Sequence, residues 1–211
     1  MAKLHALESK FDDVLSAEFR WPRKGDAPFA EASEPLDNAL IASDERSRLV
    51  LMTDGYKQAG DLMVRQTLDE PSRRDFLVFP ILFSYRHFLE LSLKYMLSVF
   101  GPHVAVEPNW TTHELAPLAK SFFEMLDNFG TPDPDEADAV VANIIAEFAK
   151  IDPRSYSNRY PVDTKGRPLP ITQAALDLSN LADVMEGVAG YFSGCDGYLS
   201  ELLNAQPSSG L

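Results

Sequence analysis

The stretch FLVFPILFSYRHFLELSLK, residues 76–94, decides the fold. Its first eight residues are all apolar, and the remainder has helical periodicity, so it predicts a helix enclosed on most sides. Arg86, Glu90 and Lys94 nevertheless recur at intervals of four, which places them on one stripe within reach of one another. A charge on an enclosed helix is costly unless it is paired or faces a cleft. The stripe therefore predicts either a site or a salt-bridged strip.

The rest of the chain predicts an all-α, up-and-down helical bundle. No stretch alternates apolar and polar residues long enough to predict a sheet, whereas several segments show helical period. We expect an N-terminal helix and irregular connector over 1–42, the bundle over 43–204 and a disordered tail over 205–211. A long helix beginning near Ser43 should direct one face inward, made of Leu49, Met52, Tyr56, Ala59, Leu62, Met63 and Gln66.

The charge balance limits the classes of ligand. With 32 acidic and 19 basic side chains the formal net charge is −13, which repels phosphate backbones over the surface as a whole. Non-specific binding to duplex DNA is therefore not expected. Residues 150–167 run against this average, because they hold five basic side chains and two acidic ones. This segment predicts local attraction of an anion.

We expect a cytoplasmic protein that does not span a membrane. The single cysteine, Cys195, has no partner within the chain, and residues 1–15 lack the continuous apolar run of a secretory signal. The apolar run at 76–83 is far shorter than the ~20 residues of a spanning helix. Zinc-protease, P-loop and hydrolase-elbow motifs are absent from the sequence, and we expect neither a metal nor a cofactor.

Four glycines near the C-terminus, Gly187, Gly190, Gly194 and Gly197, are spaced three, four and three residues apart. On one helix they would form a stripe. Because glycine costs about 1 kcal/mol in a helix interior, the stripe predicts close packing within the fold, a dimer interface, or a break in the helix.

Three further motifs occur in a fixed order. PILFSYRHFLELSLKYML is followed by HEL at His113 and then by DPRSYSNRYPVDTKGRPLP. Together, over about residues 76–170, they resemble the prokaryotic branch of the HEPN-like helical proteins. In that family an Arg-His-x-x-Glu-x-x-x-Lys helix, a His-Asp/Glu-Leu helix start and an Arg-Tyr-Pro loop recur.

The resemblance implies a helical bundle, a homodimer, and a role in a toxin–antitoxin, antiphage or stress system. Members act as RNases or as nucleotide-binding partners. The family's nuclease signature, an Arg followed four to six residues later by a His, is missing here, since Arg86 and His87 are adjacent. We therefore expect the chain to bind RNA or a nucleotide without the family's usual nuclease motif.

The expected ligand site combines Arg86, Glu90, Lys94, His113, Arg159 and Tyr160. Arg86 and Arg159 would clamp a phosphate or carboxylate, Glu90 would orient Arg86, and Tyr160 would stack on a base. One alternative is a buried polar network that locks the Arg-Tyr-Pro loop onto the bundle.

Two alternatives concern function. The first is a divergent metal-independent ribonuclease using His87 or His113 with Arg159. The second is a helical dimerisation or interaction module that binds a protein partner.

Overall fold

The computed structural model describes residues 20, 22–169 and 173–205. The chain divides into two compact units between Ile41 and Ala42. The described part of the first unit is irregular apart from one 3-10 turn, η1 (Pro35–Asp37), beside which the Asn38 side chain accepts a hydrogen bond from the backbone N–H of Ala32. The predicted first helix and most of the predicted disordered tail lie outside the described residues.

The second unit is an α-helical bundle, as predicted, and no strand occurs among the residues that the structure describes. Two 3-10 turns, η2 (Pro71–Arg73) and η3 (Gly101–Val104), flank the central helix. The α-helices are α2 (Glu45–Asp69), α3 (Arg74–Phe100), α4 (Leu115–Phe129), α5 (Ala137–Ile151) and α6 (Leu178–Ala205).

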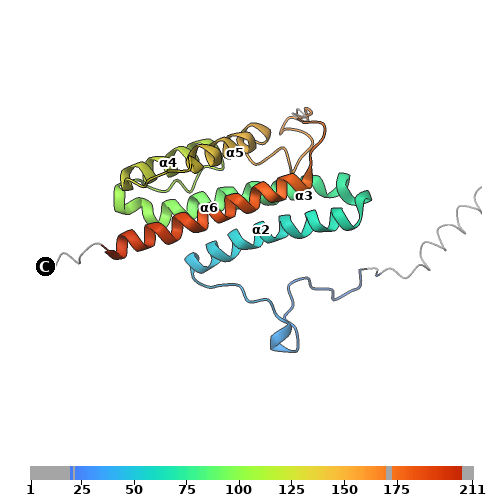
Figure 1. The fold of residues 1–211 in the computed structure, drawn as a ribbon. Helices are drawn as coiled ribbons and strands as arrows, with labels where there is room; N and C mark the ends of the chain where they lie inside the picture. Colours follow the sequence, from blue (N-terminus) through green and yellow to red (C-terminus); the bar gives the residue numbers. More distant parts are fainter. Residues whose placement is uncertain (1–19, 21, 170–172, 206–211) are drawn as a thin grey trace, which may run out of the picture. The chain divides into compact units, whose positions relative to one another are not determined.

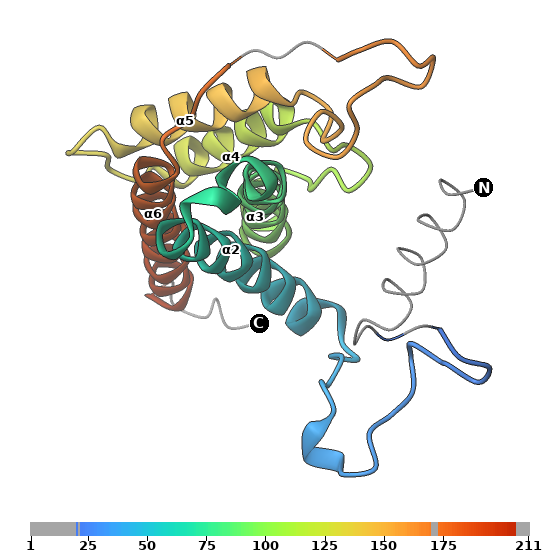
Figure 2. The same cartoon turned by 90° about the vertical axis from the view of Figure 1, so that its right-hand side faces the viewer.

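Helix α3 is the core of this bundle. It packs against α2, α4 and α6, while α5 packs on α4 (Figures 1 and 2). Apolar side chains of α3 such as Leu89, Leu93 and Leu97 are fully buried. The prediction of an enclosed central helix is therefore confirmed, and any polar group on α3 must find its partners inside the bundle.

One connection departs from simple up-and-down order. After α3 the chain runs back along that helix, so that the Trp110 carbonyl lies 3.4 Å from Lys94 Nζ and the His113 carbonyl 2.7 Å from Arg86 Nη2. Helix α4 then runs in the same direction as α3, and its Asn128 comes within 3.4 Å of the Val104 carbonyl. This return segment brings His113 beside the charged stripe.

Glycine is required where the chain reverses. A Cβ at Gly101 would lie 2.2 Å from the Val106 carbonyl oxygen, which folds back over it. The same turn is closed by a 2.9 Å hydrogen bond from the Val106 N–H to the Gly101 carbonyl. A larger residue at this position would push the return segment away from α3.

The predicted inward face of α2 is partly wrong. Leu62 is 58% exposed, whereas the buried residues are Lys57, Gly60, Val64 and Thr67. Gly60 faces Tyr85 so closely that a Cβ would lie 2.6 Å from the ring. Lys57 tolerates burial because Asp61 and Glu186 hold its ammonium at 2.8 and 2.7 Å. A count of apolar residues alone cannot identify such a face.

The four glycines of α6 do not break the helix, which is continuous through them. They also make no close contact with the described residues, because a Cβ added at any of them would meet none of those residues within 4 Å. Two of the three explanations are therefore wrong, and the dimer interface stays a prediction.

One segment, Pro71–Val104, is long and apolar enough to cross a membrane by length and composition, with a window of mean hydropathy 1.3. Within that window 56% of the residues are buried in the protein. The core helix of a globular bundle has the same properties, so this segment is weak evidence for a membrane span.

Candidate functional site

The charged stripe of α3 is a buried ion network. Arg86, Glu90 and Lys94 are 0, 1 and 5% exposed. Glu90 lies between the two cations, with Oε2 3.2 Å from Arg86 Nη1 and Oε1 2.9 Å from Lys94 Nζ. The four-residue spacing read from the sequence produces both pairs, because such residues lie one turn apart on the same face.

Arg86 also ties two distant segments to α3. Its Nη2 donates to the His113 carbonyl at 2.7 Å, and its Nε donates to the Asp152 carbonyl at 2.9 Å. Burial lowers the pKa of the Arg86 guanidinium, although the nearby carboxylates of Asp152 and Glu90 favour the charged form. A fork of fixed N–H groups suits this task, since it can serve a carboxylate and two carbonyls at once.

Asp152 extends the network into the loop after α5. Its Oδ1 accepts hydrogen bonds from the N–H groups of Tyr156 and Ser157, at 2.6 and 3.0 Å. Its Oδ2 lies 3.8 Å from Arg86 Nε and accepts no hydrogen bond from the described residues. Asp152 was not predicted from the sequence as part of the site. The available signal was an acid placed between the end of the helical pattern and Pro153, where turn-forming carboxylates are common.

Glu90 also holds His113. The His113 Nδ1 lies 2.8 Å from Glu90 Oε1, and the His113 side chain is 65% exposed while that of Glu90 is 1% exposed. Burial raises the pKa of Glu90, but the hydrogen bonds of Lys94 and His113 outweigh this and keep the pKa below its ordinary value. A buried carboxylate thus orients a surface imidazole, whose Nε2 edge is directed away from that carboxylate.

The loop anchored by Asp152 presents Arg159 and Tyr160 at the surface. Arg159 Nε donates to the Ser155 carbonyl at 2.6 Å, and its guanidinium carbon lies 5.7 Å from the Phe83 ring centre and 5.8 Å from that of Tyr160. The rings of Tyr156 and Tyr160 are 4.6 Å apart, and Tyr160 is 47% exposed. The loop therefore carries a cation beside a pair of aromatic rings.

His87 belongs to a different contact. Its ring stacks on Phe83 at 5.6 Å and meets the Tyr56 ring edge-on at 4.4 Å. Burial lowers the pKa of His87, because desolvation disfavours the imidazolium. His87 stacks on the Phe83 ring that the Arg159 guanidinium also contacts, so it lies on the Arg159 side of the site. His113 instead bonds to Glu90.

The structure thus brings the predicted residues together, but in two layers. Arg86, Glu90 and Lys94 form the buried layer, where none has the exposed surface needed to clamp a ligand. Their arrangement matches the alternative of a polar network that locks the loop onto the bundle. His113, Arg159 and Tyr160 form the exposed layer. Among the described residues, no group of three or more His, Cys, Asp and Glu side chains is placed to hold a metal ion.

Comparison with known proteins gives no relative: no family model, curated protein or solved structure matches the chain. The site must therefore be judged on its geometry.

The half-buried His87 predicts a pH dependence of stability. Its folded-state pKa is lowered, so the unfolded chain binds the proton more readily, and stability falls as the pH drops below the ordinary histidine value. Urea unfolding at about pH 7.5 and about pH 5.5 should show a smaller loss of stability for His87→Phe than for the wild type. The exposed His103 provides the control, and His103→Gln should keep the wild-type loss. An equal loss in His87→Phe would contradict this account.

Proposed function

We propose that the chain binds RNA or a nucleotide through a phosphate and a base at the loop following α5. The observation that carries the proposal is the exposed pairing of Arg159 with Tyr160. Within the described residues only Nε of Arg159 is engaged, and no carboxylate lies within ion-pair distance of its guanidinium. The remaining N–H groups are free to donate to a phosphate oxygen, in the charge-assisted bonds that arginine favours.

Tyr160 supplies the second element of recognition. Its ring is half exposed and lies 4.6 Å from that of Tyr156. Base stacking on such a ring contributes ~1–3 kcal/mol per base and does not depend on the base's identity. A cation next to an exposed aromatic ring therefore matches a phosphate next to a base.

The basic side chains around this loop are not equally available. Arg154 lies 3.7 Å from Glu114, and Arg167 pairs with Asp163 at 2.6 Å. Among the three arginines of this segment, Arg159 therefore gains most from an external anion. Because the whole chain carries a net charge of −13, binding should be local, and specific to a ligand that also stacks.

The buried network supports binding by fixing the loop in advance. Arg86 holds the start of the loop through the Asp152 carbonyl, and Asp152 Oδ1 holds the Tyr156 and Ser157 N–H groups. A loop ordered before binding avoids part of the entropy cost of ordering in the complex. The cellular setting that we propose, a prokaryotic defence, toxin–antitoxin or stress system with the chain as a homodimer, rests on the HEPN-like resemblance.

Arg159→Ala should weaken binding of a fluorescently labelled single-stranded RNA by about tenfold, because a charge-assisted phosphate contact is lost. Fluorescence anisotropy at fixed salt measures this. Arg167→Ala removes one positive charge from the same loop and is the matched control, since Arg167 already pairs with Asp163. Equal weakening by the two variants would show that the loss of affinity comes from the change in net charge and not from a contact of Arg159. Unchanged affinity in Arg159→Ala would contradict the site.

A second candidate function, a divergent metal-independent ribonuclease, is favoured by the Glu90–His113 pair. A buried carboxylate on one imidazole nitrogen fixes the tautomer and leaves the other nitrogen to accept a proton, as a general base requires. In this arrangement His113 would take the proton of the RNA 2′-hydroxyl.

Cleavage of single-stranded RNA in EDTA tests this function. The ribonuclease account predicts cleavage by the wild type and its loss in His113→Gln, with His103→Gln, an exposed histidine elsewhere, as the control. Circular dichroism checks the fold of each variant. Absence of cleavage by the wild type would contradict a ribonuclease that needs no partner. It would leave ligand binding, or the alternative of a dimerisation or interaction module that binds a protein partner.

A further inference from the structure

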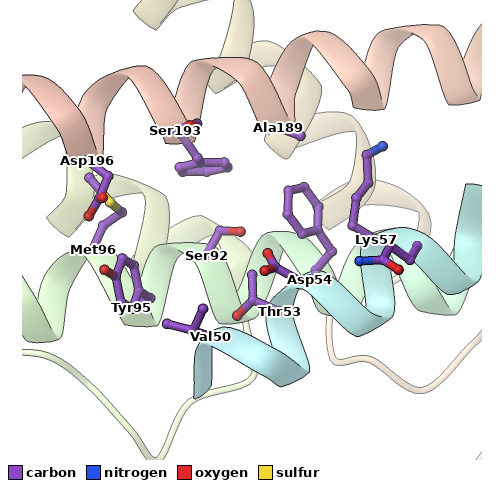
Figure 3. A pocket seen from close by; sticks show the side chains of 13 residues that line it. Val50, Thr53, Asp54, Lys57, Ser92, Tyr95, Met96, Ala189, Ser193 and Asp196 are labelled. Carbon is purple, nitrogen blue, oxygen red and sulfur yellow. The ribbon is translucent and has the colours of Figure 1, made fainter. Parts of the chain in front are cut away.

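A cavity lies on the side of α3 away from the charged stripe. It has a volume of about 310 Å³ and opens between α2, α3 and α6 (Figure 3). Helix α3 contributes Phe88, Ser92, Tyr95 and Met96 to its lining. Phe88 and Ser92 stand two residues beyond Arg86 and Glu90, which on a helix is nearly the opposite face. This cavity is therefore separate from the site of the proposed function.

The floor of the cavity is apolar. Phe88, Met96 and Phe192 are 4, 1 and 6% exposed and belong to the hydrophobic core. Val50 and Ala189 complete the apolar part from α2 and α6. A hydrocarbon or aromatic group of modest size would be desolvated here, and the volume is at the lower end of the ~300–1,000 Å³ of ligand pockets.

One polar group inside the cavity lacks a partner. Ser92 is 4% exposed, its hydroxyl projects into the space between the helices, and no hydrogen bond to it occurs among the described residues (Figure 3). Two other hydroxyls of these helices do bond back to their own helix: Thr53 donates to the Leu49 carbonyl and Ser98 to the Tyr95 carbonyl. A hydroxyl of the cavity lining that is not satisfied in this way is available to pair with a polar group of a ligand.

The charges around the cavity favour a cation. The Lys57 ammonium is already held by Asp61 and Glu186, at 2.8 and 2.7 Å. Arg46 and Asp196 both lie near the Tyr95 hydroxyl, where their opposite charges partly offset each other. Asp54 also lines the cavity, is exposed, and takes part in no ion pair among the described residues (Figure 3). An ammonium at the mouth would gain from Asp54 and would meet no unpaired cation on the lining.

We propose that this cavity binds a small amphipathic amine, with its apolar group against Phe88, Met96 and Phe192, a polar atom on Ser92, and its ammonium beside Asp54. The combination of an apolar floor, a hydroxyl with no hydrogen bond among the described residues and an exposed carboxylate at the mouth defines this class of ligand. An anionic lipid or nucleotide would meet Asp54 and Asp196 unfavourably.

Three matched probes test the proposal: 2-(1-naphthyl)ethylamine, which is cationic near neutral pH, the neutral 2-(1-naphthyl)ethanol and the anion 1-naphthylacetate. Binding is followed through the backbone amide signals of Ser92, Ala189 and Ser193, three residues of the lining. We expect the amine to bind about threefold or more tightly than the alcohol, as suits one exposed ion pair, and the acid to bind most weakly.

Substitutions in and outside the lining test whether this order of affinities arises from the cavity. Asp54→Asn should remove the advantage of the amine over the alcohol, whereas Asp69→Asn, at an exposed position of α2 outside the lining, should keep it. Ala189→Trp should fill the cavity and abolish binding of all three probes. Arg159→Ala should change none of these affinities, which separates this site from the RNA site.

Signals that move elsewhere, no binding by the amine, equal affinity for the three probes, or an advantage that survives Asp54→Asn would each overturn the proposal.

Discussion

The second unit depends on the burial of the Arg86 guanidinium. Removing an arginine from water costs several kcal/mol, and that cost is offset only if nearly every donor finds an acceptor. Here the acceptors are Glu90 on the same helix and the carbonyls of His113 and Asp152 on two other segments. The return segment after α3 and the end of α5 must therefore converge on one point of α3, which fixes where the return segment ends and where the loop after α5 begins.

Because these segments converge on Arg86, the buried charges stabilise the fold and other, exposed groups are left to bind a ligand. The network uses the charged stripe of α3 completely, so the groups left for a ligand are those that it positions: the His113 ring on Glu90, and the loop of Arg159 and Tyr160 beyond Asp152. The opposite side of α3 is apolar apart from the hydroxyls of Ser92 and Tyr95, and it faces a separate cavity. The two sides of the central helix thus differ chemically. The side of Arg159 suits the proposed phosphate ligand, and the cavity near Asp54 suits the proposed amine.

Much of the bundle was readable from the sequence, because apolar periodicity reports burial and four-residue spacing reports which charges pair. The predicted cluster of Arg86, Glu90 and His113 does come together. The pattern does not report how deeply the charges are buried, because a solvated strip and a buried network have the same four-residue spacing. Here the return segment covers the stripe and makes it a buried network. Asp152 was missed because its partner is 66 residues away, and the buried face of α2 was misjudged because Lys57 is neutralised by a residue of α6.

The central claim is that Arg86 holds the loop after α5 in place. Hydrogen exchange at the Tyr156 and Ser157 amides, both bonded to Asp152, tests this most directly in Arg86→Lys, which keeps the charge but loses the planar fork. The account predicts exchange at these two amides faster by about tenfold or more, while buried amides of α6 such as Val188 keep their protection. Unchanged protection at Tyr156 and Ser157 would contradict it.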